Sequence, residues 1–155
     1  MRLVGRYKAL TAAERRLLLR AAVLVVAIRA ALWTLPYRTT KAWVDKLRSP
    51  GGPARQLDRR LIHQVAWATG AVSRRVPGAS CLTQALAMQL ILGRLGQASE
   101  LRLGVARDSV GKFEAHAWVE VQGRVVHGGA IPGFNRYSPL KEQLTQSIYN
   151  PTVSN

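Results

Sequence analysis

The residues best suited to chemistry in this chain are its single cysteine, Cys81, and His116, which follows 35 positions later. Ser80 is a typical N-cap, so we expect Cys81 in the first turn of an apolar helix. Free N–H groups and the positive end of the helix dipole favour a thiolate there and can bind an oxyanion. The alternative for Cys81 is a small buried apolar side chain. A histidine within reach would make the thiol a candidate nucleophile.

His116 belongs to the segment EAHAWVEV, which has the alternation of a strand. We expect the small apolar face to pack inward, and it holds Ala115, Ala117, Val119 and Val121. The other face would carry His116, Trp118 and Glu120, that is, an imidazole, an aromatic ring and a carboxylate. This combination predicts the wall of a substrate cleft rather than a core.

A third group is needed to orient the imidazole and select its tautomer. If Gln122-Gly123 is a two-residue hairpin loop, Val121 pairs with Arg124 and Trp118 pairs with His127. His127 then shares a face with His116 and is the favoured orienting group. Glu120 shares that face but lies roughly 6.5–7 Å along the strand. A zinc site made of the cysteine and these two histidines is an alternative, although no paired ligand spacing supports it.

The elements that would position these residues form an α+β arrangement. Thr11 and Glu14 form a capping box, so a helix should start at about Ala12 and end at Pro36. A second helix is expected over about 55–75, and a central helix over 80–96 is apolar nearly all round. Strands are predicted at 101–105, 113–121 and 124–127, and a short helix near 140–145.

The Pro/Gly-rich segment 47–55 predicts a linker. It would separate an N-terminal helical region, 1–50, from a core, 51–155, within one compact unit overall. Residues 1–75 contain 16 basic and 3 acidic residues out of a chain with net charge +15, which favours an anionic partner. We expect contacts from Arg15, Arg16, Arg20, Arg59 and Arg60. No nucleic-acid motif is present, so nucleic acid is not expected.

The apolar stretch 17–35 is interrupted by Arg20 and Arg29, which leave only Ala21–Ile28 unbroken. Eight residues are too few to cross a bilayer, so we expect a buried or interfacial helix with peripheral membrane contact as one option. A single cysteine excludes an intramolecular disulfide and fits a reducing cytoplasm.

Four segments together resemble the transglutaminase-like cysteine peptidases of lasso-peptide biosynthesis. They are SCLTQAL (80–86), LGRLG (92–96), LGV (103–105) and HAWVEV (116–121), and the resemblance covers about residues 78–140. It implies a papain- or transglutaminase-like fold without metal or cofactor, in which Cys81 is the nucleophile and His116 the general base. The family commonly has an aspartate on the next strand, where this chain has His127.

The resemblance also implies removal of the leader from a ribosomal precursor peptide. The expected partners are that precursor, a separate leader-recognition protein and an ATP-using lasso macrolactam synthetase. The basic residues named above would contact the recognition protein or an acidic leader. Two other interpretations stay open: an amide-forming transferase that uses the same two residues, and a non-catalytic scaffold that docks partners.

Overall fold

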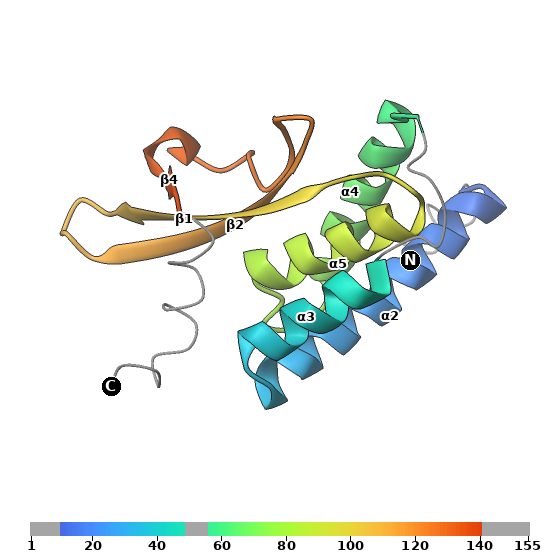
Figure 1. The fold of residues 1–155 in the computed structure, drawn as a ribbon, viewed down its shortest axis with the longest axis horizontal. Helices are drawn as coiled ribbons and strands as arrows, with labels where there is room; N and C mark the ends of the chain where they lie inside the picture. The colour runs from blue at the N-terminus through green and yellow to red at the C-terminus, as the bar shows by residue number, and fades with distance from the viewer. Residues whose placement is uncertain (1–9, 49–55, 141–155) are drawn as a thin grey trace, which may run out of the picture.

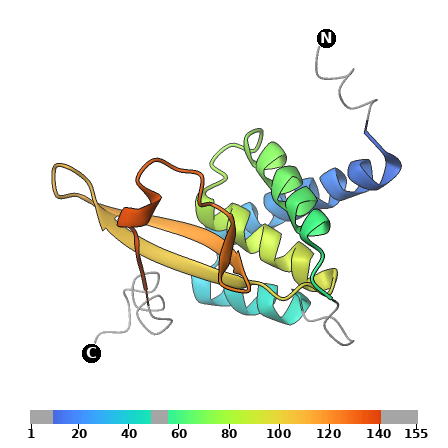
Figure 2. The ribbon, with the colours of Figure 1, turned by 90° about the horizontal axis from the view of Figure 1, so that it is seen from above.

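The computed structural model describes residues 10–48 and 56–140, which form helices followed by a small sheet (Figures 1 and 2). The elements in chain order are α2 (Ala12–Thr34), α3 (Tyr37–Arg48), α4 (Arg59–Ser73), α5 (Cys81–Arg94), β1 (Glu100–Arg107), β2 (Phe113–Val121), β3 (Arg124–His127), the 3-10 helix η1 (Phe134–Arg136) and β4 (Ser138–Pro139). The predicted α+β class is confirmed. The division into 1–50 and 51–155 stays a prediction.

The first helix begins where its capping signal predicts. The Thr11 hydroxyl accepts from the Glu14 N–H at 3.2 Å, and the Glu14 carboxylate accepts from the Thr11 N–H at 2.8 Å. Pro36 ends α2 as expected, but α3 follows at once and was not predicted. A proline is tolerated at the start of a helix, and the Pro36 carbonyl accepts from the Thr40 N–H at 3.2 Å.

The second predicted helix begins four residues later than expected. Asp58 is the N-cap of α4, and its carboxylate accepts from the Leu61 N–H at 2.9 Å. Most of the predicted linker, residues 49–55, and all but the first residue of the predicted helix near 140–145 lie outside the described residues.

The central helix is α5, as its all-round apolar pattern predicts. Its residues from Leu82 to Leu92 are buried except Gln84. One core cluster joins α5 to the inner faces of α2 and β2, and it includes Val25 and Val119, which are both fully buried. Figure 1 shows α5 on one side of the sheet and residues 128–137 on the other. The core therefore lies between the helices and one face of the sheet.

The sheet is antiparallel with the order β3-β2-β1-β4. Gln122 and Gly123 form the hairpin loop with φ of 50° and 72°, as two-residue loops of this kind require. The predicted pairs Val121–Arg124 and Glu120–Val125 are present, but an irregularity then pairs Val119 with His127.

The predicted pair between Trp118 and His127 is therefore wrong. A bulge of one residue reverses the side to which the following side chain points. His127 shares the face of Val119, which is the core face, instead of the face of His116.

Candidate active site

Cys81 is the first residue of α5, as predicted, and it is half-buried against the core cluster. The Ser80 hydroxyl caps the helix by accepting from the Thr83 N–H at 3.3 Å. The N–H groups of Cys81 and Leu82 have no acceptor among the described residues, and the first turn holds no acidic residue. These two N–H groups can therefore donate to an oxyanion that forms beside the sulfur.

The imidazole of His116 is oriented by a backbone carbonyl. Its Nε2 lies 2.7 Å from the Gly128 oxygen. A carbonyl oxygen can only accept, so Nε2 carries the proton and the neutral ring keeps Nδ1 as its unprotonated nitrogen. The ring packs beside Tyr137, Phe134 and Trp118, with centroids 5.4, 6.3 and 6.3 Å away. The Gly128 carbonyl thus orients the imidazole, a role that was expected of a third side chain.

The second face of β2 is covered, whereas an open face was predicted. Trp118 is 2% exposed, and Phe134 packs edge-on against it at 5.2 Å between centroids. Conversely, Ala115, which was expected inside, is exposed. Trp118 is buried because residues 128–137 fold back over this face. Ala115 is exposed because the core ends before it along β2.

Residues 134–137 are held on this face by Glu114. The Arg136 guanidinium is 2.6 Å and the Tyr137 hydroxyl 3.2 Å from the Glu114 carboxylate. Neither partner was singled out in the sequence, because 20 or more positions separate each from Glu114.

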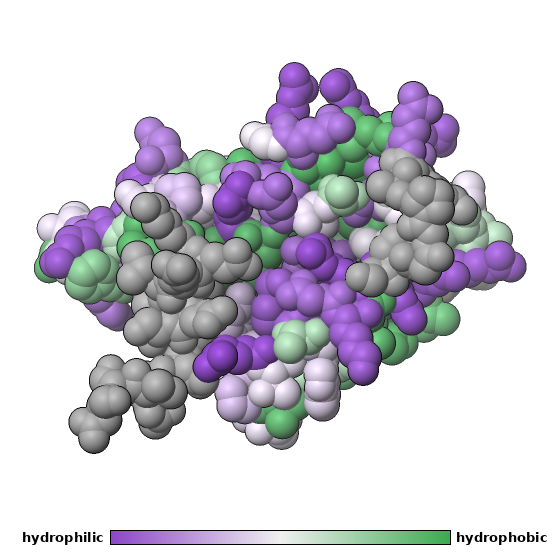
Figure 3. Space-filling model, viewed as in Figure 1, coloured by the Kyte–Doolittle hydropathy of each residue, from purple (hydrophilic) through white to green (hydrophobic). Residues whose placement is uncertain are grey.

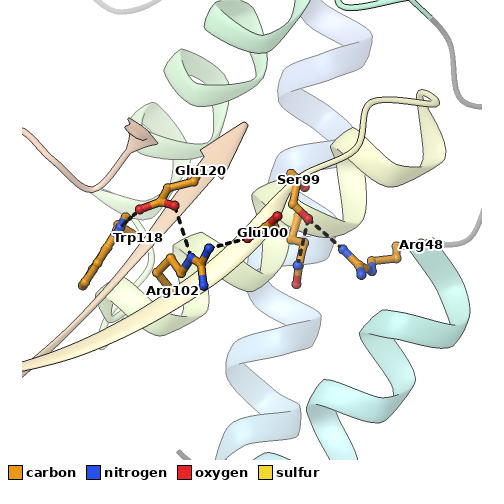
Figure 4. Close-up of polar contacts among 7 residues, drawn as sticks. Arg48, Ser99, Glu100, Arg102, Trp118 and Glu120 are labelled. Atoms are coloured by element: carbon orange, nitrogen blue, oxygen red, sulfur yellow. Dashed lines mark hydrogen bonds and ion pairs between the residues drawn. The ribbon is translucent and has the colours of Figure 1, made fainter. Parts of the chain in front are cut away.

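Glu120 is engaged by residues other than His116 (Figure 4). One carboxylate oxygen accepts from the Trp118 indole N–H at 2.8 Å, and the other lies 3.2 Å from Arg102 Nε. Arg102 also pairs with Glu100 at 2.6 Å. Glu120 therefore holds the indole and the β1–β2 pair together, and it does not orient the imidazole.

His127 lies on the helix side of the sheet. Its Nε2 donates to the Gln84 side-chain oxygen at 3.2 Å, and Gln84 is one helical turn after Cys81. Burial, and then the charge of His116, lower the pKa of His127 below its ordinary value. The Nε2 atoms of the two imidazoles are bonded to different partners, His127 to Gln84 and His116 to Gly128.

The open edge of β2 lies between the two faces. Because β3 ends opposite Val119, the part of β2 that holds His116 has β1 as its one strand neighbour among the described residues.

Within 10–48 and 56–140 no three His, Cys, Asp or Glu side chains converge on a possible metal position, so the alternative zinc site is not assembled. Cys81 Sγ makes no hydrogen bond in these ranges, and its pairing with His116 stays a prediction.

Sequence reasoning missed Gly128 and Gln84. Gly128 has φ of 86°, and a Cβ there would lie 2.9 Å from both the Ala117 oxygen and Trp118 Cβ. A Gly-Gly pair directly after a strand was the available signal for such a close approach. Gln84 had no signal, because nothing local shows which face of α5 meets β3.

The predicted basic residues fall into two groups. Arg16 and Arg20 line a cavity of about 250 Å³ between α2 and α4. The hydrogen bonds from Thr11 lower the pKa of Glu14, which also lines this cavity, and the charge of Arg60 lowers it less. Arg15 donates to the Leu10 carbonyl at 3.0 Å in the same region.

Arg59 stands apart, in a groove of about 550 Å³ between α4 and the β2–β3 hairpin. Its lining is Leu57, Arg59, Ile62, His63, Val121, Gln122, Arg124, Val125 and Val126. Three of these residues are basic or imidazole side chains, and none is acidic.

This arrangement, a cysteine-headed central helix packed on a small antiparallel sheet, defines a class of cysteine-based α+β domains. The chain matches the model of the Transglutaminase-like superfamily over residues 9–142, and it belongs to that superfamily. The superfamily includes cysteine peptidases. No curated protein and no solved structure matches the chain.

Proposed function

We propose that this protein is a cysteine peptidase that removes the leader from a lasso-type precursor peptide. The observation that carries the proposal is the single cysteine at the head of α5 in a transglutaminase-like domain. It is supported by His116, whose Nδ1 is kept as the free base by the Gly128 carbonyl. The lasso substrate rests on the HAWVEV and SCLTQAL segments and their spacing.

In the proposed reaction, Nδ1 of His116 takes the proton of the Cys81 thiol. The sulfur attacks the carbonyl carbon of the leader–core bond, and the oxyanion is bound by the N–H groups at the start of α5. The C–N bond breaks as His116 returns the proton to the leaving amine. Water then attacks the thioester, so that the acid product forms and the thiol is restored.

The two residues would meet at the open edge of β2. Cys81 would approach this edge from the helix side, where Gln84, one turn after it, holds His127. His116 would approach it from the other face, where the Gly128 carbonyl holds its ring. Catalytic hydrogen bonds are often long without substrate, so we expect the bound peptide to complete the approach.

The groove beside β3 suits the leader. β3 is one of the two outer strands of the sheet, and an extended peptide can pair with such an edge while its side chains enter neighbouring pockets. Arg59 and Arg124 favour acidic residues in that peptide, and β3 leads directly to His127 and Gly128. The recognition protein and the macrolactam synthetase would then act on the same precursor.

The first test uses the fact that Cys81 is the single cysteine, so alkylation reports on it alone. We expect iodoacetamide to modify Cys81 at neutral pH faster than a free thiol, and His116→Gln to remove the advantage. Val110→Gln, in the exposed β1–β2 turn, is the control and should alkylate like the parent. Equal rates for the parent and the free thiol would favour the scaffold interpretation.

The second test combines the protein, a precursor and its recognition protein, and measures the products by mass. Free leader and core with one added water indicate hydrolysis, whereas a cross-linked product without that water indicates the transferase. We expect hydrolysis, and its loss in Cys81→Ala. Cleavage by Cys81→Ala would refute the proposed nucleophile.

A further inference from the structure

The outer face of α2 exposes a row of large apolar side chains to solvent. Leu19, Val23, Val26 and Trp33 are 66, 60, 54 and 77% exposed. They recur at spacings of three, four and seven, so they form one stripe along the helix. Figure 3 shows apolar surface along the lower right edge, where α2 runs. A contiguous exposed stripe of this kind marks an interaction surface.

The opposite face of α2 is part of the core. Ala21 and Val25 are fully buried and Ile28 is 5% exposed, and α2 packs against α4 and α5. Within 10–48 and 56–140, α2 is the one helix long and apolar enough to cross a membrane by length and composition. Crossing would pull these three side chains out of the core. The geometry therefore favours a helix that lies flat on a surface.

The charged residues beside the stripe indicate the charge of the surface that α2 would bind. Arg16 and Arg20 lie next to the apolar residues near the start of the helix, and the Arg29 guanidinium lies over the Trp33 ring at 4.7 Å. The one acidic residue of α2 is Glu14, and its carboxylate is bound in the capping box. A protein partner would need a face that is both acidic and apolar in the matching places, whereas an anionic bilayer has negative headgroups above apolar acyl chains at every point of its surface.

We propose that the outer face of α2 binds the surface of an anionic membrane. Leu19, Val23 and Val26 would enter the boundary between headgroups and acyl chains, to a depth of about 5–10 Å. Trp33 would lie at headgroup level, where indole rings concentrate, and the arginines would pair with lipid phosphates. This surface is independent of the peptidase proposal, since it uses none of the residues around Cys81.

The test is sedimentation of the full chain with vesicles of phosphatidylglycerol and phosphatidylcholine in equal parts. We expect binding that weakens with added salt and is at least about tenfold weaker on pure phosphatidylcholine. The triple variant Leu19→Gln, Val23→Gln, Val26→Gln should bind the anionic vesicles at least about tenfold more weakly, because it removes the inserted apolar area.

The matched control is Val110→Gln with Phe113→Gln, which removes exposed apolar residues at the β1–β2 turn, 85 and 63% exposed. It should bind vesicles like the parent, and circular dichroism should show that both variants stay folded. No sedimentation with anionic vesicles, or equal binding by the triple variant, would overturn the proposal. A lipid-free dimer that becomes monomeric in the triple variant would overturn it too, because the stripe would then pair two copies.

Discussion

Gly104→Ala gives a quantitative test of the packing around His116. Gly104 is buried in β1 opposite His116 in the register. A Cβ there would lie 2.7 and 2.8 Å from two atoms of the Trp118 ring and 3.0 Å from the Ser138 carbonyl oxygen. Ordinary carbon contacts are about 3.5–4.0 Å, so the indole has to move by most of an ångström.

The expected net loss of stability follows from two opposing effects. Alanine restricts the unfolded chain, which stabilises by about 0.4–1 kcal/mol where the backbone is unstrained. Overpacking typically costs about 1–3 kcal/mol, and Trp118 cannot move without disturbing its bond to Glu120. We therefore expect a net destabilisation of about 1–2 kcal/mol, or a fall in Tm of about 2–8 °C for a chain of this size.

Urea and thermal unfolding followed by circular dichroism measure this difference. Gly70→Ala is the control, since its Cβ would meet Arg74 at 3.6 Å and His127 at 3.9 Å, both ordinary contacts. It should stabilise α4 by up to about 1 kcal/mol. In a Trp118→Leu background the cost of Gly104→Ala should shrink, because the clashing ring is gone. A Gly104→Ala protein as stable as the parent, or an unchanged cost in that background, would refute the packing argument.

Three further predictions concern stability. The pKa of His127 is lowered in the folded state, so the unfolded chain binds more protons below about pH 6.5. The unfolding free energy should therefore fall as the pH drops through that range, and His127→Gln should flatten this pH dependence. Glu120→Leu should cost about 1–3 kcal/mol by leaving the buried Trp118 N–H without its acceptor, whereas Glu120→Gln should cost less, as chemical denaturation of the two proteins would show. Gly93→Ala should lower the unfolding free energy by about 1–3 kcal/mol, although alanine has the better helix propensity, because the added Cβ would lie 2.6 Å from the Arg48 backbone oxygen. A Tm equal to or above that of the parent would contradict this close packing.

The sequence by itself determined the features that depend on neighbouring residues. Ser80 selects the start of α5 because its hydroxyl bonds an N–H three positions on, and the capping box at Thr11 works in the same way. Gln122-Gly123 determines the hairpin because both residues accept a positive φ. The all-round apolar pattern of α5 likewise required burial, so the place of Cys81 at the head of a central helix could be predicted.

Only the tertiary structure decided which groups meet around the imidazoles. The bulge between Val125 and His127 turned His127 toward Gln84, and alternation within one strand cannot reveal such a bulge. The carbonyl that orients His116 belongs to Gly128, and every residue has a carbonyl, so residue type carries no signal for it. Trp118 became buried because Phe134 folds back from a segment without periodicity. These contacts join residues 12 or more positions apart, and their free energy depends on the packing of the whole domain rather than on local conformational preference.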